Sequence, residues 1–163
     1  MYAVRQWSVR HARGLNTFYR GFEGFLVRVH RLFAFIGYER AERPVAFVEK
    51  HVKGLLFDCQ MCGQCVLSST GMSCPMNCPK TLRNGPCGGV RANGHCEVKP
   101  EMKCVWVEAY RGSRRIDGGV EAMTQVQFAV DQRQKGRSSW LRVVREKTPG
   151  AGQADAPAKG AKP

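Results

Sequence analysis

Cysteine is absent from most of this chain. The sequence has 163 residues and eight cysteines, and all of the cysteines lie between Cys59 and Cys104. Acidic residues are scarce, with 13 Asp and Glu against 26 Lys and Arg, which gives a net charge of +13. A chain this basic predicts anionic partners: an acidic protein, an acidic small molecule or nucleic acid. Because the basic residues are spread along the chain rather than gathered into one arm, no nucleic-acid-binding segment is indicated.

The sequence also lacks a long uninterrupted hydrophobic run. No apolar run follows the basic N-terminal residues, so the pattern of a secretory signal is missing. The most apolar stretch, residues 22–36, is broken by Glu23, Arg28, His30 and Arg31. It is too polar and too short to span a bilayer. We therefore expect no transmembrane segment and a cytoplasmic location, where thiols stay reduced and disulfides are disfavoured.

The common catalytic motifs are missing as well. The sequence has no Gly-x-Ser-x-Gly, no phosphate-binding loop and no paired carboxylates in a local context. Aromatic and basic residues do not interleave as they do in RNA-binding modules. An enzyme that acts alone is therefore not expected, and no nucleic-acid partner is expected either.

Apolar spacing predicts a helix in the N-terminal region. Apolar residues recur at helical intervals over residues 18–36, and Gly37 would end the helix. The opposite face carries Arg20, Arg28 and Arg31. We interpret this as a helix that packs in a core or against a partner, in preference to one that lies on anionic lipid.

A second helix is expected to begin at Pro44, because proline suits the first helical position. It would end near Gly54. Its expected apolar face consists of Val45, Val48, Val52 and Leu55.

Shorter helical segments follow the last cysteine. They are expected over residues 105–110 and 120–130, and a final short helix would be capped by Ser138. Trp106 and Trp140 are expected to lie in the core, although a tryptophan of this kind can also anchor a partner.

The segment that holds the cysteines is rich in Gly, Pro and Asn and poor in periodic apolar residues. Such a segment cannot bury enough apolar surface to offset the entropy lost on ordering. Bound metal is the alternative means of holding it. The spacing is C-x2-C-x2-C-x8-C-x3-C-x8-C-x8-C-x7-C, and the candidate metal ligands are Cys59, Cys62, Cys65, Cys74, Cys78, Cys87, Cys96 and Cys104.

Iron–sulfur and zinc are the two competing cofactors. The C-x2-C-x2-C run of Cys59, Cys62 and Cys65 is the spacing with which bacterial ferredoxins hold [4Fe–4S], and two Cys-Pro pairs follow it. We therefore expect one or two [4Fe–4S] clusters. A C-x2-C hairpin is also half of a zinc site, so Zn²⁺ remains the alternative. Which cysteines share a site cannot be determined from the spacing.

A second unusual stretch is Asn84-Gly85-Pro86-Cys87-Gly88-Gly89. Its glycines permit backbone torsions closed to other residues and the close approach of another group. Gly85, Pro86, Gly88 and Gly89 are therefore candidates for the surface that a cofactor approaches. The alternative is a tight turn that presents Cys87 to a metal.

Together these features predict a small, metal-stabilised, loop-rich cysteine domain flanked by α-helices, with mostly α and irregular structure. The expected divisions are a basic amphipathic helical region at residues 1–43, the cysteine-rich metal-binding domain with its flanking helices at 44–147, and a disordered tail at 148–163.

Several strings resemble the methylenetetrahydrofolate reductase C-terminal domain family, which includes the small cysteine-rich partner subunit of acetogenic methylenetetrahydrofolate reductases. The resemblance runs from about Pro44 to Tyr110 and returns at Ser138-Ser139-Trp140-Leu141. The strings that carry it are Cys59-Gln60-Met61-Cys62-Gly63-Gln64-Cys65, Cys74-Pro75, Cys78-Pro79-Lys80, Asn84-Gly85-Pro86-Cys87-Gly88-Gly89, Asn93-Gly94-His95-Cys96-Glu97-Val98 and Cys104-Val105-Trp106.

The resemblance implies an accessory role. In such systems a flavin-containing barrel subunit reduces methylenetetrahydrofolate, and the cysteine-rich subunit binds to it and holds metal. The accessory subunit would relay electrons to the flavin or stabilise the complex. The implied partners are this flavoprotein, which alone would carry the flavin, and an acidic electron-donor protein. The alternatives are a structural zinc-binding assembly module and, less favoured, a nucleic-acid-binding zinc ribbon.

Overall fold

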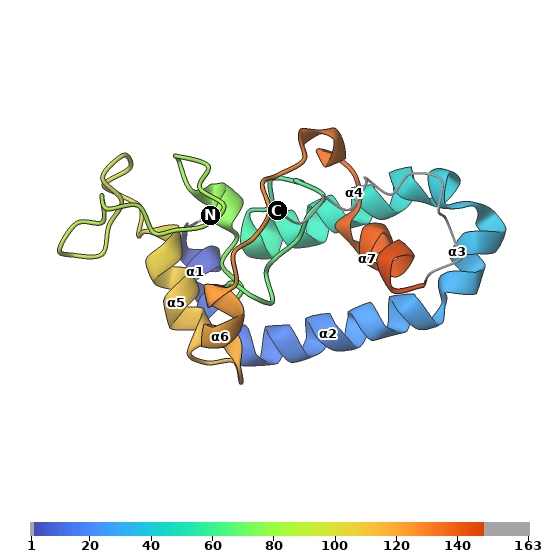
Figure 1. Cartoon of the computed structure of the whole chain (residues 1–163), viewed down its shortest axis with the longest axis horizontal. Coiled ribbons are helices and arrows are strands. Elements are labelled where there is room, and N and C mark those ends of the chain that lie inside the picture. Colours follow the sequence, from blue (N-terminus) through green and yellow to red (C-terminus); the bar gives the residue numbers. More distant parts are fainter. Residues whose placement is uncertain (1, 149–163) are drawn as a thin grey trace, which may run out of the picture.

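The computed structural model describes residues 2–148, and these form helices joined by irregular segments (Figure 1). No β-strand occurs within these residues, although two isolated antiparallel bridges pair Val90 with Cys96 and His95 with Lys103. The expectation of mostly helical and irregular structure is confirmed. Apart from Thr148, the predicted disordered tail lies outside the described residues. The elements are α1 (Tyr2–Arg10), α2 (Ala12–Arg28), α3 (His30–Ile36), α4 (Tyr38–Phe57), η1 (Pro75–Asn77), α5 (Val105–Ser113), α6 (Gly119–Thr124), η2 (Gln132–Gln134) and α7 (Ser139–Lys147).

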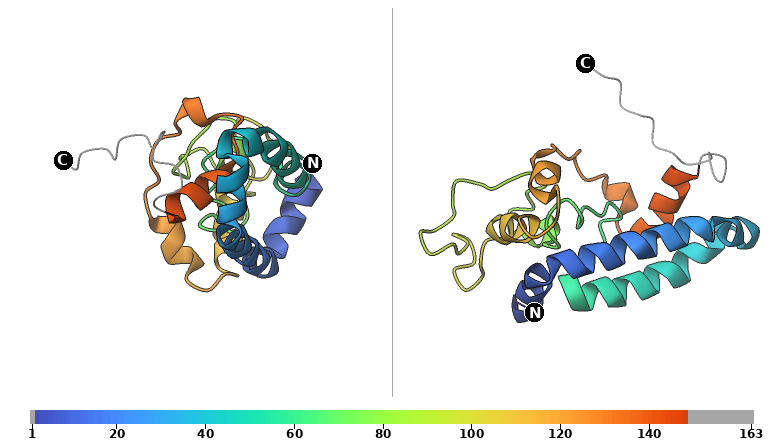
Figure 2. Two further views of the ribbon diagram at one scale, coloured as in Figure 1. Left: turned by 90° about the vertical axis from the view of Figure 1, so that its right-hand side faces the viewer. Right: turned by 90° about the horizontal axis from the view of Figure 1, so that it is seen from below.

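The molecule is elongated, with α3 and the neighbouring parts of α2 and α4 at one end and the loops between η1 and α5 at the other, where α1, α5 and α6 also lie (Figures 1 and 2). Helices α2 and α4 run in opposite directions and are linked through α3. Helix α7 packs against both of them, although it is far from both in the sequence. Helix α1 packs against α4 and α5 and so connects the two ends. No helix in residues 2–148 combines the length and the apolar character needed to cross a bilayer.

The expected helix over residues 18–36 is present in two pieces, because the chain bends at Val29 between α2 and α3. Only Leu26 of its apolar stripe is buried, in a core that also contains Tyr38, Ala41, Leu141 and Val144. The partly buried Phe22 packs against this core, and Phe18 and Phe25 are exposed at 73% and 59%. The helix thus has one side in the core and leaves several aromatic rings in contact with solvent.

The prediction for the second helix was wrong in two respects. Helix α4 begins at Tyr38, after Gly37 with φ of +90°, so Pro44 lies inside the helix. An interior proline removes a backbone hydrogen bond and costs roughly 3 kcal/mol. Burial of Tyr38 and Ala41 in the core stabilises the turns before Pro44. The predicted division between residues 43 and 44 falls within this continuous helix.

The second error concerns the face of α4 that is buried. Val48, Val52 and Leu55 are exposed at 52%, 44% and 68%. The buried face instead carries two charged side chains, and its members are Tyr38, Ala41, Glu49, Lys53 and Phe57. Their spacings of three, eight, four and four residues keep them on one side of the helix, and the charged pair lines the candidate site described below.

The helices after the last cysteine are close to expectation. Trp106 lies in α5 and is buried at 6% exposure, so its core position is confirmed. Helix α6 ends at Thr124, and the predicted continuation to residue 130 is wrong. The backbone of Gln127 exchanges two hydrogen bonds with the side chain of Asn84, at 2.8 and 2.9 Å, which holds this stretch in a non-helical conformation. Ser138 caps α7 as predicted, because its Oγ accepts a hydrogen bond from the N–H of Leu141.

Candidate metal centre

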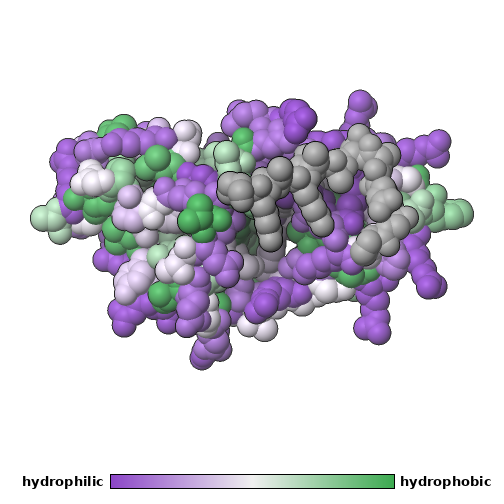
Figure 3. All heavy atoms as spheres, viewed as in Figure 1, coloured by the Kyte–Doolittle hydropathy of each residue, from purple (hydrophilic) through white to green (hydrophobic). Residues whose placement is uncertain are grey.

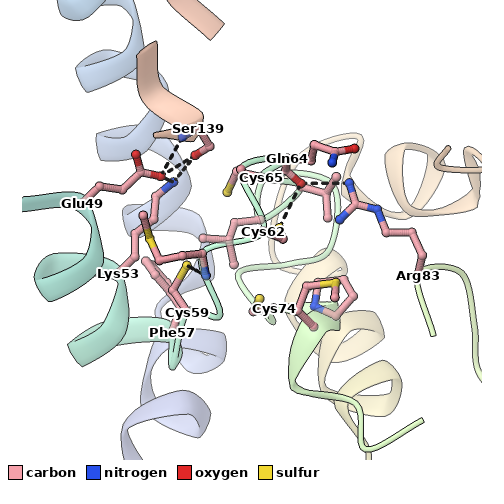
Figure 4. A pocket seen from close by; sticks show the side chains of 16 residues that line it. Glu49, Lys53, Phe57, Cys59, Cys62, Gln64, Cys65, Cys74, Arg83 and Ser139 are labelled. Carbon is pink, nitrogen blue, oxygen red and sulfur yellow. Dashed lines mark hydrogen bonds and ion pairs between the residues drawn. The ribbon is translucent and has the colours of Figure 1, made fainter. Parts of the chain in front are cut away.

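Four of the eight cysteines line one cavity (Figure 4). Cys59, Cys62 and Cys65 come from the loop that follows α4, and Cys74 precedes η1. The labelled sulfur atoms surround a common space between the end of α4 and the loops. The structure therefore brings the three-cysteine run together with the first Cys-Pro pair.

The path of the loop is set at the end of α4. Asp58 adopts a left-handed conformation with φ of +53°, and the N–H of Cys59 donates to the carbonyl of Lys53 at 3.3 Å. Gly63 has φ of +72°, and a Cβ added there would lie 2.4 Å from the carbonyl oxygen of Gln134. Glycine is required at this position for both reasons. The cysteine loop is thereby held against the segment that leads into α7.

Cys74 is positioned by the close packing of the Gly71 backbone against α5. Gly71 has φ of +56°, and an added Cβ would lie 2.2 Å from the backbone nitrogen of Ser113 in α5. The hydroxyl of Ser73 donates to the carbonyl of Val105 at 3.0 Å. Contacts with α5 therefore fix the approach to Cys74.

A buried ion pair forms one wall of the cavity. Glu49 and Lys53 are each 1% exposed, and Nζ of Lys53 donates to Oε1 of Glu49 at 2.8 Å. Lys53 also donates to Oγ of Ser139 at 2.7 Å and to the hydroxyl of Tyr19 at 3.1 Å. The carboxylate of Glu49 accepts hydrogen bonds from the hydroxyls of Ser138 and Ser139, and from the N–H of Trp140 at 3.3 Å. It thus interacts with the first turn of α7, where the helix dipole favours a negative charge.

Burial governs the protonation of the groups in this cavity. Burial and the neighbouring Cys59 and Cys65 raise the pKa of Cys74 to about 12. Burial also raises the pKa of Cys59 to about 11, although the N–H of Met61 opposes the shift. Without metal both thiols therefore keep their protons at neutral pH, and a bound metal ion has to displace them.

Burial alone would lower the pKa of Lys53. The neighbouring Cys65, Glu49 and Tyr19 outweigh it, so the pKa of Lys53 is raised and the ammonium group stays charged. A permanent positive charge therefore lies beside Cys65 at the cavity wall.

The remaining four cysteines do not line this cavity. Cys96 packs with Met102 and Val105, while Cys104 packs with Trp106 and Ala109 in a separate cluster. All eight cysteines are free thiols. In residues 2–148, no group of three or more Cys, His, Asp or Glu side chains is arranged as a closed set of metal ligands.

The glycine-rich stretch makes specific contacts within the protein. A Cβ added at Gly85 would lie 2.6 Å from Nε1 of Trp106, and one at Gly89 would overlap the carboxylate of Glu97. Gly85, Pro86 and Gly88 are exposed, and nothing lies within 4 Å of a Cβ added at Gly88. The close approach at Gly85 and Gly89 is thus to the chain itself, and the role of this stretch as a cofactor surface stays a prediction.

The donor set of the cavity fits a metal cofactor. Thiolates are soft ligands that select zinc and iron–sulfur clusters over hard cations. Arg83 also lines the cavity, and its Nε and Nη1 are buried without a hydrogen-bond partner. Buried donors of this kind call for an acceptor, and metal-bound sulfur is an acceptor.

Sequence reasoning missed the charged and hydroxyl-bearing residues at and beside this site. Tyr19, Glu49, Lys53, Arg83 and Ser139 were not recognised as neighbours of the cysteines. One signal was available, because Glu49 and Lys53 are four residues apart, a spacing typical of helical ion pairs. The ion pair lies on the same side of α4 as Tyr38, Ala41 and Phe57, which is the buried face.

Comparison with known proteins gives a family match. Residues 38–133 match the family described as methylene-tetrahydrofolate reductase C terminal. The match begins at the first residue of α4, contains all eight cysteines and ends before the Ser138–Leu141 string. No curated protein and no solved structure matches the chain.

Proposed function

Because the chain belongs to the methylene-tetrahydrofolate reductase C-terminal family, we propose that it is an accessory metal-binding subunit that docks a flavin-dependent methylenetetrahydrofolate reductase or a related folate one-carbon enzyme. The observation that supports this most strongly is the cavity lined by Cys59, Cys62, Cys65 and Cys74. Residues 2–148 form no β-strand, so they contain no barrel for a flavin. In this proposal the folate chemistry lies outside the described residues, on the flavoprotein.

The four cavity cysteines would hold a [4Fe–4S] cluster. The prediction allows a second cluster, but Cys96 and Cys104 lie in separate packing clusters, so no second ligand set is proposed. A bound [4Fe–4S] cluster supplies one-electron transfer, which in this subunit would run from a donor protein to the flavin of the partner. The residues of the chain bind the cofactor, neutralise its charge and limit its contact with water. Phe57 and Leu67 are buried at 5% and 3% exposure and line the same cavity.

The helical end of the molecule offers the docking surface for the flavoprotein. Large apolar side chains are exposed there among basic ones, and Figure 3 shows apolar side chains among hydrophilic ones at the right-hand edge of the molecule. Aromatic residues and arginine are the types enriched at protein interfaces. The exposed apolar residues of α2, α3 and α4 are Phe18, Phe25, Leu32, Phe35, Ile36, Phe47, Val48, Val52 and Leu55. The net charge of +13 suits an acidic electron donor.

A structural zinc module is the second candidate. It is supported by the same thiols, because an all-cysteine set is also the donor set of structural zinc sites. In that case the cavity would stabilise the fold and the complex without electron transfer. Metal analysis separates the two candidates.

The test is anaerobic purification of the native complex, followed by flavin, iron, sulfide and zinc analysis. We expect the chain to co-purify with a flavin-containing methylenetetrahydrofolate reductase and to be brown, with iron and sulfide in equal amounts. A colourless protein with stoichiometric zinc would eliminate the electron-transfer role. A chain that purifies free of any flavoprotein would contradict the docking.

A further inference from the structure

Arg83 lines the four-cysteine cavity. No carboxylate within residues 2–148 lies at ion-pair distance from it, whereas several other arginines form ion pairs. Among the described residues its only hydrogen bond runs from Nη2 to the carbonyl oxygen of Gln64, at 2.9 Å. Nε and Nη1 are buried and have no hydrogen-bond partner within residues 2–148. Two buried N–H donors left in this state are unfavourable, because the lost hydration is not replaced.

The geometry shows which group can supply the missing partner. The carbonyl oxygen of Gln64 also accepts a hydrogen bond from Sγ of Cys62, at 3.6 Å. The thiol of Cys62 and the guanidinium of Arg83 therefore meet on one oxygen atom, and in Figure 4 the guanidinium points from the loop wall towards the cysteines. A metal-bound Cys62 has no proton to donate. Its sulfur becomes an acceptor beside the guanidinium.

Lys53, the other cation of the cavity, is less suited to donate hydrogen bonds to the cysteines. Lys53 lies on the opposite side of the cavity from Arg83 in Figure 4. Its charge is already neutralised by Glu49 at 2.8 Å, and its ammonium donates to two further hydroxyls. Of Lys53 and Arg83, only Arg83 brings an uncompensated charge and N–H donors without a partner to the cysteines.

We propose that Arg83 is a positioning residue of the cysteine centre, which donates Nε–H and Nη1–H hydrogen bonds to sulfur and balances the negative charge of the thiolate-bound group. This inference rests on the proposed function, since it requires a cofactor at Cys59, Cys62, Cys65 and Cys74. Hydrogen bonds to sulfur and local charge are the means by which a protein raises the reduction potential of an iron–sulfur cluster. The same contacts slow the loss of any thiolate-bound metal.

The test compares three variants of the metal-loaded protein. Arg83→Gln removes the charge, Arg83→Lys keeps the charge without the planar donors, and Arg91→Gln removes an equal charge from an exposed arginine elsewhere in the loops. The measurements are metal content, the rate of metal loss to excess chelator and, where iron is present, the midpoint potential by redox titration with electron paramagnetic resonance detection.

We expect Arg83→Gln to lose metal at least about tenfold faster than the wild type. Its reduction should become less favourable by at least about tenfold, which is a negative shift of 59 mV for one electron. Arg83→Lys should recover part of both effects, and Arg91→Gln should match the wild type. A folded Arg83→Gln variant without metal, together with a loaded Arg83→Lys variant, would support the same assignment.

Two results would overturn the inference about Arg83 and leave the proposed function intact. In the first, Arg83→Gln keeps both the wild-type potential and the wild-type rate of metal loss. In the second, Arg83→Lys is impaired as strongly as Arg83→Gln and both are less resistant to urea, which indicates a structural role. A wild-type protein that holds no metal under anaerobic conditions would instead contradict the proposed function, and this inference with it.

Discussion

Lys53 and Glu49 show at the scale of single residues how a charged pair can be buried in this protein. Each is 1% exposed, and the pair is satisfied by Ser138, Ser139 and Tyr19. The ammonium also lies 5.2 Å from the ring centroids of Tyr19 and Trp140, within range of a cation–π interaction. The large desolvation penalty of the pair is therefore offset only while every partner is present.

Removal of one member of this pair should be strongly destabilising. We expect Lys53→Met to lower the free energy of unfolding by about 3–5 kcal/mol, because Glu49 is left buried and charged. The double variant Glu49→Leu with Lys53→Met should be more stable than Lys53→Met alone. Urea unfolding of the metal-loaded proteins measures both effects.

The matched control is Arg142→Ala, which breaks an exposed pair with Glu146 of the same i, i+4 spacing. It should change stability by less than about 1 kcal/mol. Equal effects of Lys53→Met and Arg142→Ala would show that the buried pair is not specially constrained.

Gly71 is a second residue whose identity is dictated by its surroundings. Gly71→Ala should lower the free energy of unfolding by more than about 2 kcal/mol, because the methyl group would meet the backbone of α5 at a positive φ. Gly21→Ala in α2 is the control, since nothing lies within 4 Å of an added Cβ. This control should raise stability by about 0.5–1 kcal/mol. Thermal unfolding of both variants tests the contrast, and a neutral Gly71→Ala would contradict it.

At the scale of elements, α7 completes two separate structures. Leu141 and Val144 are fully buried in the core beside Leu26 of α2 and Tyr38 of α4. The first turn of α7 presents Ser138, Ser139 and Trp140 to the Glu49 carboxylate. The Ser-Ser-Trp-Leu string thus links the helical core to the cavity wall.

Ser138→Ala should therefore cost more than an ordinary helix cap. Loss of a cap costs about 1 kcal/mol, and here Glu49 also loses a buried donor, which adds about 1–3 kcal/mol. Thr124→Ala is the control, because that hydroxyl is exposed and bonds only within its own helix end. Urea unfolding should separate the two variants by at least about 1 kcal/mol. Similar midpoints would contradict the link between α7 and Glu49.

The sequence allowed the type of most elements to be predicted, but not the face that α4 buries. Capping by Ser138 and the burial of Trp106 follow from local chemistry, and both are confirmed. The valines at 48 and 52 gave the stronger periodic signal, yet they face solvent. The charged face is buried because serines from α7 satisfy it, and those serines are more than 85 residues away in the chain. Contacts of that separation leave no local pattern.

The same reason limits prediction of the metal centre. All eight cysteines were predicted as candidate ligands, but their grouping was not, and the structure shows that the three-cysteine run and Cys74 line one cavity. Arg83 could not be found, because only the fold places its guanidinium beside Cys62.

At the scale of the whole molecule, the cysteine cavity and the exposed apolar side chains lie on different faces of α4, because Lys53 and Phe57 line the cavity while Val52 and Leu55 are exposed. This separation predicts that docking and metal binding can be impaired independently. Phe25→Asp in α2 should weaken binding to the flavoprotein by at least about tenfold, because the ring is 59% exposed in the proposed docking surface. Isothermal titration measures this affinity.

Phe128→Asp is the matched control, since Phe128 is 93% exposed and lies outside these helices. It should bind the flavoprotein as the wild type does. Both variants should keep the wild-type metal content. A Phe25→Asp variant that binds normally would exclude this part of α2 from the interface.

The most direct test of the metal centre is isotope-coded alkylation of the anaerobically purified protein, read by mass spectrometry at each cysteine. Cys59, Cys62, Cys65 and Cys74 should be protected together, and on addition of a chelator all four should become reactive at one common rate, since ligands of one centre are released as a set. Reaction of the four thiols at unrelated rates, or at the same rates before and after the chelator, would contradict a shared metal centre.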